Sequence, residues 1–179
     1  LARDSGVIVC QVGEGADELF IGYPGWKTKY ELQKLANVPF TLPVKKALAR
    51  LLVLLGKDKN VLFEALIRSA RGQPVFWGGA EAFTDKQKKK LLSKSMREKI
   101  ADRTSWDSIK PIHDRFKTKD REGSTLNWMT YLDLNLRLPE LLLMRVDKMS
   151  MGVSLEARVP FSDHKMVELA LSLPSKRKI

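Results

Sequence analysis

The chain has 179 residues, 44% of them hydrophobic, and a formal net charge of +11. This length fits one ordinary domain with a packed core. No run of eighteen apolar residues occurs, which excludes a transmembrane helix, and the charged start does not resemble a signal peptide. The positive charge admits nucleic acid, acidic membranes or a phosphate-rich substrate as partners.

Cysteine content and the two chain ends add two expectations. The only cysteine is Cys10, inside an apolar segment. A lone cysteine of this kind favours a reducing compartment such as the cytoplasm and excludes a disulfide framework. The missing initiator Met and the abrupt end after Lys178 predict a piece of a longer protein.

The stretch at residues 7–23, VIVCQVGEGADELFIGY, organises the sequence. Its β-branched start predicts a parallel strand over 7–12 that is buried on both faces. Gly13 and Gly15 then bracket Glu14, and glycine permits both positive φ and close approach of another group to the backbone. Together they predict a strand followed by a tight acidic turn.

Two more carboxylates, Asp17 and Glu18, follow in the first turn of a predicted helix, where the macrodipole favours them. The free N–H groups of such a turn can bind an anion. A phosphate beside Glu14, Asp17 and Glu18 would be repelled unless a divalent cation lay between them, and oxygen ligands of this kind suit Mg²⁺. The residues alone leave a solvated acidic turn equally open, because the spacing matches neither the P-loop nor the dinucleotide fingerprint.

The middle of the chain is predicted to be mainly helical. Thr84 with Gln87 fits a capping box that opens a lysine-rich helix reaching about Arg103. A solvated face is the favoured interpretation of these lysines, and RNA or DNA binding is the alternative. The loop at 73–83 is expected to pack through its apolar residues. Helical spacing of apolar residues predicts helices over 43–56, 60–69, 84–103, 106–117 and 124–136.

A second group of charges follows a leucine-rich helix that Pro139 can open. Arg145, Asp147 and Lys148 lie at its far end, where they can face a site. An ordinary ion pair of Arg145 with Asp147 or Glu140 is the alternative.

The segment 152–160 alternates between apolar and polar residues. In an extended strand, Ser154, Glu156 and Arg158 share one side. This row can face a site, or Glu156 and Arg158 can form a structural pair.

Two stretches resemble signatures of the asparagine synthase family of glutamine-dependent amidotransferases. GEGADELFIGY, residues 13–23, resembles G-E-G-A-D-E-L-F-G-G-Y, and residues 138–164, LPELLLMRVDKMSMGVSLEARVPFSDH, resemble the family block L-P-D/E-x-L-L-x-K/R-x-D-K/R-x-S/T-M-x-x-S-L/V-E-x-R-x-P-F-L-D-H. The resemblance covers residues 1–24 and 126–179 well. Val12 departs from the usual Ser, Ile21 from the first Gly of G-G-Y, and Ser162 from the Leu of P-F-L-D-H.

The resemblance implies an α/β parent domain of the adenine nucleotide alpha hydrolase-like, ATP-pyrophosphatase type, with a parallel sheet and helices. Residues 1–179 would be its C-terminal portion, mostly α-helical with one or two short strands. The pyrophosphate loop and the N-terminal glutaminase domain would lie outside it. The chain alone is therefore expected to be inactive.

The family's chemistry implies the cofactors ATP and Mg²⁺. ATP adenylates a carboxylate, aspartate by default, and ammonia from glutamine displaces AMP. Glu14 and Arg145 would be catalytic, and Asp17 would hold the metal with the pyrophosphate. The nucleotide would also contact Val12, Gly13, Gly15 and Lys148, with Glu18, Asp147, Glu156 and Arg158 in support.

The implied partners are ATP, a small carboxylate and the glutaminase domain of the parent chain, with a homodimer left open. Neither a membrane nor nucleic acid is favoured, and a cytoplasmic location is expected. Two other functions stay open at this point. One is a basic helical module that binds nucleic acid, and the other is a non-catalytic relative of the synthetase domain.

Overall fold

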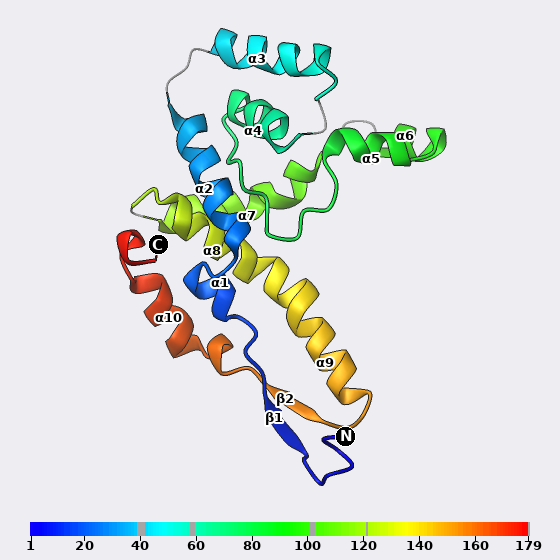
Figure 1. Cartoon of the computed structure of the whole chain (residues 1–179), viewed down its shortest axis with the longest axis vertical. Coiled ribbons are helices and arrows are strands. Elements are labelled where there is room, and N and C mark those ends of the chain that lie inside the picture. The colour runs from blue at the N-terminus through cyan, green and yellow to red at the C-terminus, as the bar shows by residue number, and fades with distance from the viewer. Residues whose placement is uncertain (39–41, 58–59, 101–102, 121, 179) are drawn as a thin grey trace. The chain divides into compact units, whose positions relative to one another are not determined.

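The structure is a computed structural model that describes residues 1–178 except 39–41, 58–59, 101–102 and 121 (Figure 1). The chain divides into two compact units. One unit, here the terminal unit, combines Leu1–Trp26 with Phe116–Ile179, and the other, the central unit, is Lys27–Arg115. Among the described residues, no helix is long and apolar enough to cross a membrane.

The terminal unit contains one parallel strand pair. Strand β1 (Val9–Gln11) pairs with β2 (Glu156–Arg158), and Cys10 lies opposite Ala157. The remaining elements of this unit are helical: α1 (Ala16–Phe20), α8 (Thr125–Asn135), the π-helix η1 (Leu138–Leu143), α9 (Met144–Met151), the 3-10 turn η2 (Pro160–Ser162), α10 (His164–Ser172) and the 3-10 turn η3 (Ser175–Arg177).

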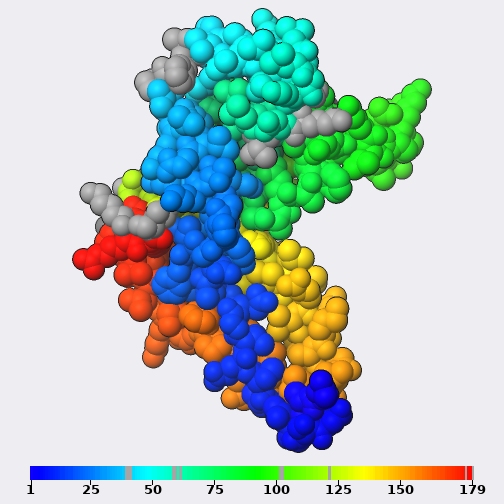
Figure 2. Space-filling model, viewed as in Figure 1, coloured from blue at the N-terminus to red at the C-terminus, as the bar shows by residue number. Residues whose placement is uncertain are grey.

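The prediction of a strand buried on both faces is wrong for this chain. Regular pairing begins only at Val9, and Ile8 is 60% exposed. On the face drawn in Figure 2, the N-terminal residues lie uncovered at the surface. A parallel strand is buried when neighbours cover its edges and faces, and within the described residues β1 pairs with β2 alone.

Helix α8 supplies the core of the terminal unit. Ser124 caps it by accepting a hydrogen bond from the Asn127 N–H at 3.4 Å, as the sequence predicts. Leu19 of α1 is buried in the same unit, and α1 contacts both α8 and α10. The buried side chains of α8 are Leu126, Trp128, Met129, Thr130, Leu132 and Asp133.

The central unit is built from helices: the greater part of α2 (Pro24–Asn37), α3 (Leu42–Leu54), α4 (Val61–Ala70), α5 (Asp85–Leu91), α6 (Lys94–Ile100) and the first part of α7 (Ser105–Lys119). Helix α3 packs on α4 (Figure 1). Asn60 caps α4 by accepting from the Leu62 N–H at 3.1 Å. The loop before α5 buries Val75, Phe76 and Trp77, which confirms its expected packing role.

The predicted single helix from Thr84 to Arg103 is two helices, α5 and α6. The capping box of Thr84 and Gln87 is confirmed. Leu92 adopts an extended conformation that ends α5, and the Ser93 hydroxyl then accepts a hydrogen bond from the Met96 N–H at 3.3 Å. Serine favours such caps over helix interiors, so the basic residues are divided between two short helices.

Candidate active site

The acidic turn leaves the strand pair at its carboxyl end. Beyond the last paired residues, the Val12 N–H donates a hydrogen bond to the Arg158 carbonyl at 2.9 Å. Gly13, Glu14 and Gly15 follow directly, ahead of α1. The carboxyl ends of parallel strands are where open α/β sheets bind their ligands.

Gly15 is the glycine that this turn requires. Its φ is +97°, and an added Cβ would lie 3.2 Å from the Ser162 Oγ. An added Cβ at Gly13 would meet nothing within 4 Å. Of the two properties that glycine permits, Gly15 therefore uses positive φ, whereas φ at Gly13 is not positive.

Replacing Gly15 by Ala should destabilise the local fold by about 1–3 kcal/mol, because alanine resists this backbone conformation. The double variant Gly15→Ala/Ser162→Ala should be less destabilised than Gly15→Ala, because it lacks the close approach of the new Cβ to the Ser162 Oγ. Ser162→Ala alone should be close to neutral, since the buried hydroxyl has no hydrogen-bond partner among the described residues. Amide hydrogen exchange across α1 in the full-length protein measures these changes.

Gly13→Ala is the matched control and should change local stability by less than about 0.5 kcal/mol. Equal losses at Gly13 and Gly15 would contradict this account of the turn.

The three carboxylates of the turn do not gather on one side. Asp17 is exposed and Glu14 is partly exposed, but Glu18 is only 1% exposed. Glu18 accepts a hydrogen bond from the Tyr23 hydroxyl at 2.6 Å. Within the part of the chain that the structure describes, no three metal-ligating side chains form a cluster.

Asp17 nevertheless fits the metal that the turn suggests. Mg²⁺ keeps several waters and takes one or two protein carboxylates together with substrate phosphates. An exposed carboxylate beside the end of a parallel strand pair offers such a ligand. Glu18 is unsuited to this role because its carboxylate points into the core.

The second group of predicted site residues lies on α9. Arg145, Asp147 and Lys148 are all exposed there. The alternative ion pair of Arg145 with Asp147 or Glu140 does not form among the described residues. Arg145 and Asp147 are two residues apart, and residues at this spacing do not face each other on a helix, which explains why they do not pair.

The π-helix η1, which the sequence does not predict, directly precedes α9 and begins beside the acidic turn. Its first residue, Leu138, places Cδ2 3.8 Å from where a Gly15 Cβ would lie. Arg145 follows seven residues later, roughly 10 Å along the helix axis. Single π-helical turns are frequent at functional sites.

On β2, the predicted alternation is confirmed over Leu155 to Val159 but is wrong at Ser154, whose φ of 55° is not that of an extended strand. Leu155, Ala157 and Val159 are partly buried, whereas Glu156 and Arg158 are exposed. The Arg158 Nε donates to Glu156 Oε1 at 2.8 Å. The structural pair that the sequence left open therefore forms, although an exposed pair of this kind contributes at most about 1 kcal/mol.

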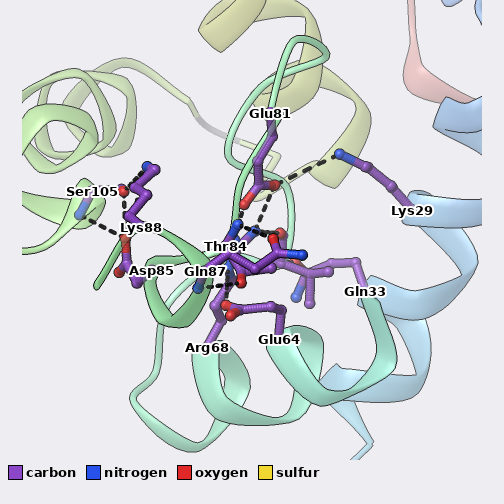
Figure 3. Close-up of polar contacts among 11 residues, drawn as sticks. Lys29, Gln33, Glu64, Arg68, Glu81, Thr84, Asp85, Gln87, Lys88 and Ser105 are labelled. Atoms are coloured by element: carbon purple, nitrogen blue, oxygen red, sulfur yellow. Dashed lines mark hydrogen bonds and ion pairs between the residues drawn. The ribbon is translucent and has the colours of Figure 1, made fainter. Parts of the chain in front are cut away.

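The central unit contains a buried ionic cluster that sequence reasoning missed (Figure 3). The Arg68 guanidinium is bidentate to Glu81, lies 3.5 Å from Glu64, and donates to the Val75 carbonyl at 2.8 Å. The Trp77 ring centroid is 3.9 Å from its central carbon. In the sequence, the four-residue spacing between Glu64 and Arg68 is the feature that indicates an ion pair here.

This cluster fixes the loop before α5. The Lys29 ammonium lies 3.8 Å from Glu81 and donates to the Gly78 carbonyl at 3.3 Å. Gln33 accepts a hydrogen bond from the Val75 N–H at 2.6 Å. The four charged side chains of the cluster, Lys29, Glu64, Arg68 and Glu81, border a cavity of about 310 Å³. Because the charges satisfy one another, the cluster is structural.

The basic helices α5 and α6 border a larger groove of about 930 Å³. Lys88 at its edge is engaged with Ser105, and the Lys86 ammonium lies 5.9 Å from the Phe63 ring centroid. The groove is lined by the charged residues Asp85, Lys88, Lys89, Lys94, Arg97, Glu98 and Arg103 and by the uncharged residues Leu91, Leu92, Ile100, Thr104 and Ser105. The lysine face that the sequence predicts on one helix is thus divided between α5 and α6, and Lys86 and Lys88 contact other residues of the central unit.

A parallel strand pair that ends in an acidic glycine turn, with an exposed carboxylate beside it, is the kind of place where open α/β sheets bind their ligands. The family model described as asparagine synthase matches residues 1–179. The chain belongs to the asparagine synthase family.

Two relatives illustrate the similarity. Glutamine-hydrolyzing asparagine synthetase 1 of Bacillus subtilis (strain 168) is 30% identical over 176 residues, which cover 96% of this chain and 26% of the relative. Asparagine synthetase 3 of the same organism is 55% identical over 38 residues, or 21% of this chain and 6% of the relative. The chain spans about a quarter of the length of the relatives that it matches over most of its own length. No solved structure matches it significantly.

Proposed function

We propose that the chain is part of an ATP-dependent amidotransferase of the asparagine synthetase type. In this reaction ATP adenylates a carboxylate, with aspartate as the first candidate, and releases pyrophosphate. Ammonia derived from glutamine then displaces AMP and leaves the amide. A glutaminase domain of the same protein is the proposed source of that ammonia.

The proposed roles follow the chemistry of each group. Mg²⁺ held by Asp17 would neutralise charge on the leaving pyrophosphate. The exposed Arg145 and Lys148 would stabilise charge that develops on the phosphorus and its oxygens. Glu14 would guide the ammonia or accept its proton.

Other residues would shape the nucleotide site. The backbone at Val12 and Gly13 would contact ATP, since an added Cβ at Gly13 meets no obstacle and leaves that backbone accessible. Gly15 would keep the turn tight. Asp147, Glu156 and Arg158 would support the neighbouring surface.

The observation that carries the proposal is the acidic turn at the carboxyl end of β1 and β2. There, Asp17 is exposed, while its neighbour Glu18 is buried and accepts a hydrogen bond from the Tyr23 hydroxyl. This arrangement presents one carboxylate outward, as coordination of Mg²⁺ with a phosphate requires. Membership of the asparagine synthase family supports the same assignment.

ATP–pyrophosphate exchange by the full-length protein tests the proposal. A panel of carboxylates is supplied with Mg²⁺, and exchange that requires aspartate is expected. Exchange with a sugar acid or an antibiotic precursor in its place would keep the adenylation step and replace the acceptor.

Removal of Mg²⁺ with a chelator should abolish the exchange, because the leaving pyrophosphate then carries uncompensated charge. No exchange with any acid, in a folded protein that binds ATP, would overturn the proposal. That result would favour a non-catalytic relative.

A further inference from the structure

The Asp17 carboxylate lies directly against Gly22. A Cβ added at Gly22 would be in contact with Asp17 Oδ1, 2.9 Å from its Cγ and 3.3 Å from its Cα. The Gly22 N–H also donates to the Asp17 carbonyl at 3.1 Å. The carboxylate therefore occupies the space that any other residue at position 22 would fill.

Ile21 produces the reversal that brings Gly22 under Asp17. It caps α1 in the left-handed region, with φ 61° and ψ 40°. This conformation is an outlier for a β-branched residue and persists only where the surroundings enforce it. Position 21 is also where the family signature carries glycine, so this chain maintains the reversal against a steric cost.

Tyr23 anchors the end of the reversal. Its hydroxyl donates to the buried Glu18 carboxylate at 2.6 Å. Burial, reinforced by the hydrogen bond to Glu18, raises the pKa of the Tyr23 phenol. A tyrosine hydroxyl is protonated at neutral pH in any case, so it is available as a donor. The bond ties residue 23 back to the middle of the five-residue helix α1.

Arg137 completes the anchor from another part of the chain. Its guanidinium lies 4.0 Å from the Tyr23 ring centroid, and its Nη1 lies 3.7 Å from the Asp133 carboxylate. Asp133 is fully buried on α8. The ring that secures Glu18 is therefore held between α1 and the end of α8.

We propose that Gly22, Tyr23 and Arg137 are positioning residues that fix the direction of the Asp17 carboxylate. Gly22 provides the space, while Tyr23 and Arg137 prevent α1 from rotating. A helix as short as α1 is weak by itself, so the direction of its side chains depends on such anchors. The inference rests on the proposed function, in which this carboxylate takes the metal.

Metal binding in the full-length protein tests the inference, with Mn²⁺ as a spectroscopic probe in the presence of ATP. Gly22→Ala displaces the carboxylate and should raise the Mn²⁺ concentration for half-saturation roughly 10-fold, as loss of ligand orientation typically does. Tyr23→Phe removes only the hydroxyl and should also raise the Mn²⁺ concentration for half-saturation.

Gly25→Ala is the matched control. An added Cβ at Gly25 meets nothing within 4 Å, so the half-saturation should not change. If Gly22→Ala fails to fold, Tyr23→Phe and Arg137→Lys decide the question. Lysine keeps the charge of Arg137 but lacks the guanidinium group that lies over the Tyr23 ring.

The outcomes separate the two proposals. Wild-type half-saturation in folded Gly22→Ala and Tyr23→Phe would overturn the positioning role and leave the proposed function intact. A wild-type protein that binds ATP without any dependence on a divalent cation would overturn both. A shift in the variants with Gly25→Ala unchanged would support the inference.

Discussion

Replacing Asp17 by asparagine is expected to lower the rate of ATP–pyrophosphate exchange by roughly 100-fold or more. The substitution keeps the size and polarity of the side chain but removes the negative charge that would hold Mg²⁺. Asp17 is exposed and its neighbour Glu18 is buried, so no second carboxylate of α1 can replace it. The measurement is the exchange rate of the full-length protein at saturating ATP and acceptor.

Glu168→Gln is the control for this experiment. Glu168 is an exposed carboxylate on α10 in the same unit, and its loss removes the same charge from a surface with no proposed role. We expect its exchange rate to match wild type. An Asp17→Asn variant that exchanges at the wild-type rate would show that the metal is held elsewhere.

Local sequence determines the turn that carries Asp17. The strand at Val9, the positive φ at Gly15 and the helix that follows are all adjacent in sequence, and their residue types predict them. The caps at Asn60, Thr84 and Ser124 are equally local. Such features follow from propensity and hydrogen-bonding chemistry within a few residues.

Features that depend on distant residues were not predicted. Arg137 contacts the ring of Tyr23, although more than a hundred residues separate the two in sequence. Neither residue type by itself predicts the contact. The same holds for Gln33, which accepts from the Val75 N–H. The prediction that β1 is buried is wrong for a related reason. Burial of a parallel strand requires neighbouring strands, and among the described residues β1 has only β2.

Replacing Arg68 by leucine is expected to destabilise the central unit by about 3–5 kcal/mol. Removing the guanidinium leaves the largely buried Glu64 without its counter-ion and, among the described residues, leaves Glu81 with Lys29 alone, at 3.8 Å. It also leaves the Val75 carbonyl without its donor. Burial raises the pKa of Glu64 even with Arg68 in place, as expected where a carboxylate loses part of its hydration. Amide hydrogen exchange of α4 and α5 in the full-length protein measures the loss.

Lys110→Met provides the matched control. Lys110 pairs with Asp114 on the surface of α7, where both side chains are more than half exposed. Loss of such a pair should cost no more than about 0.5 kcal/mol, because water solvates the remaining charge. The two variants each remove one cation from an ion pair, so the difference between them isolates the effect of burial. Equal protection in both would mean that the Arg68 cluster does not hold the loop before α5.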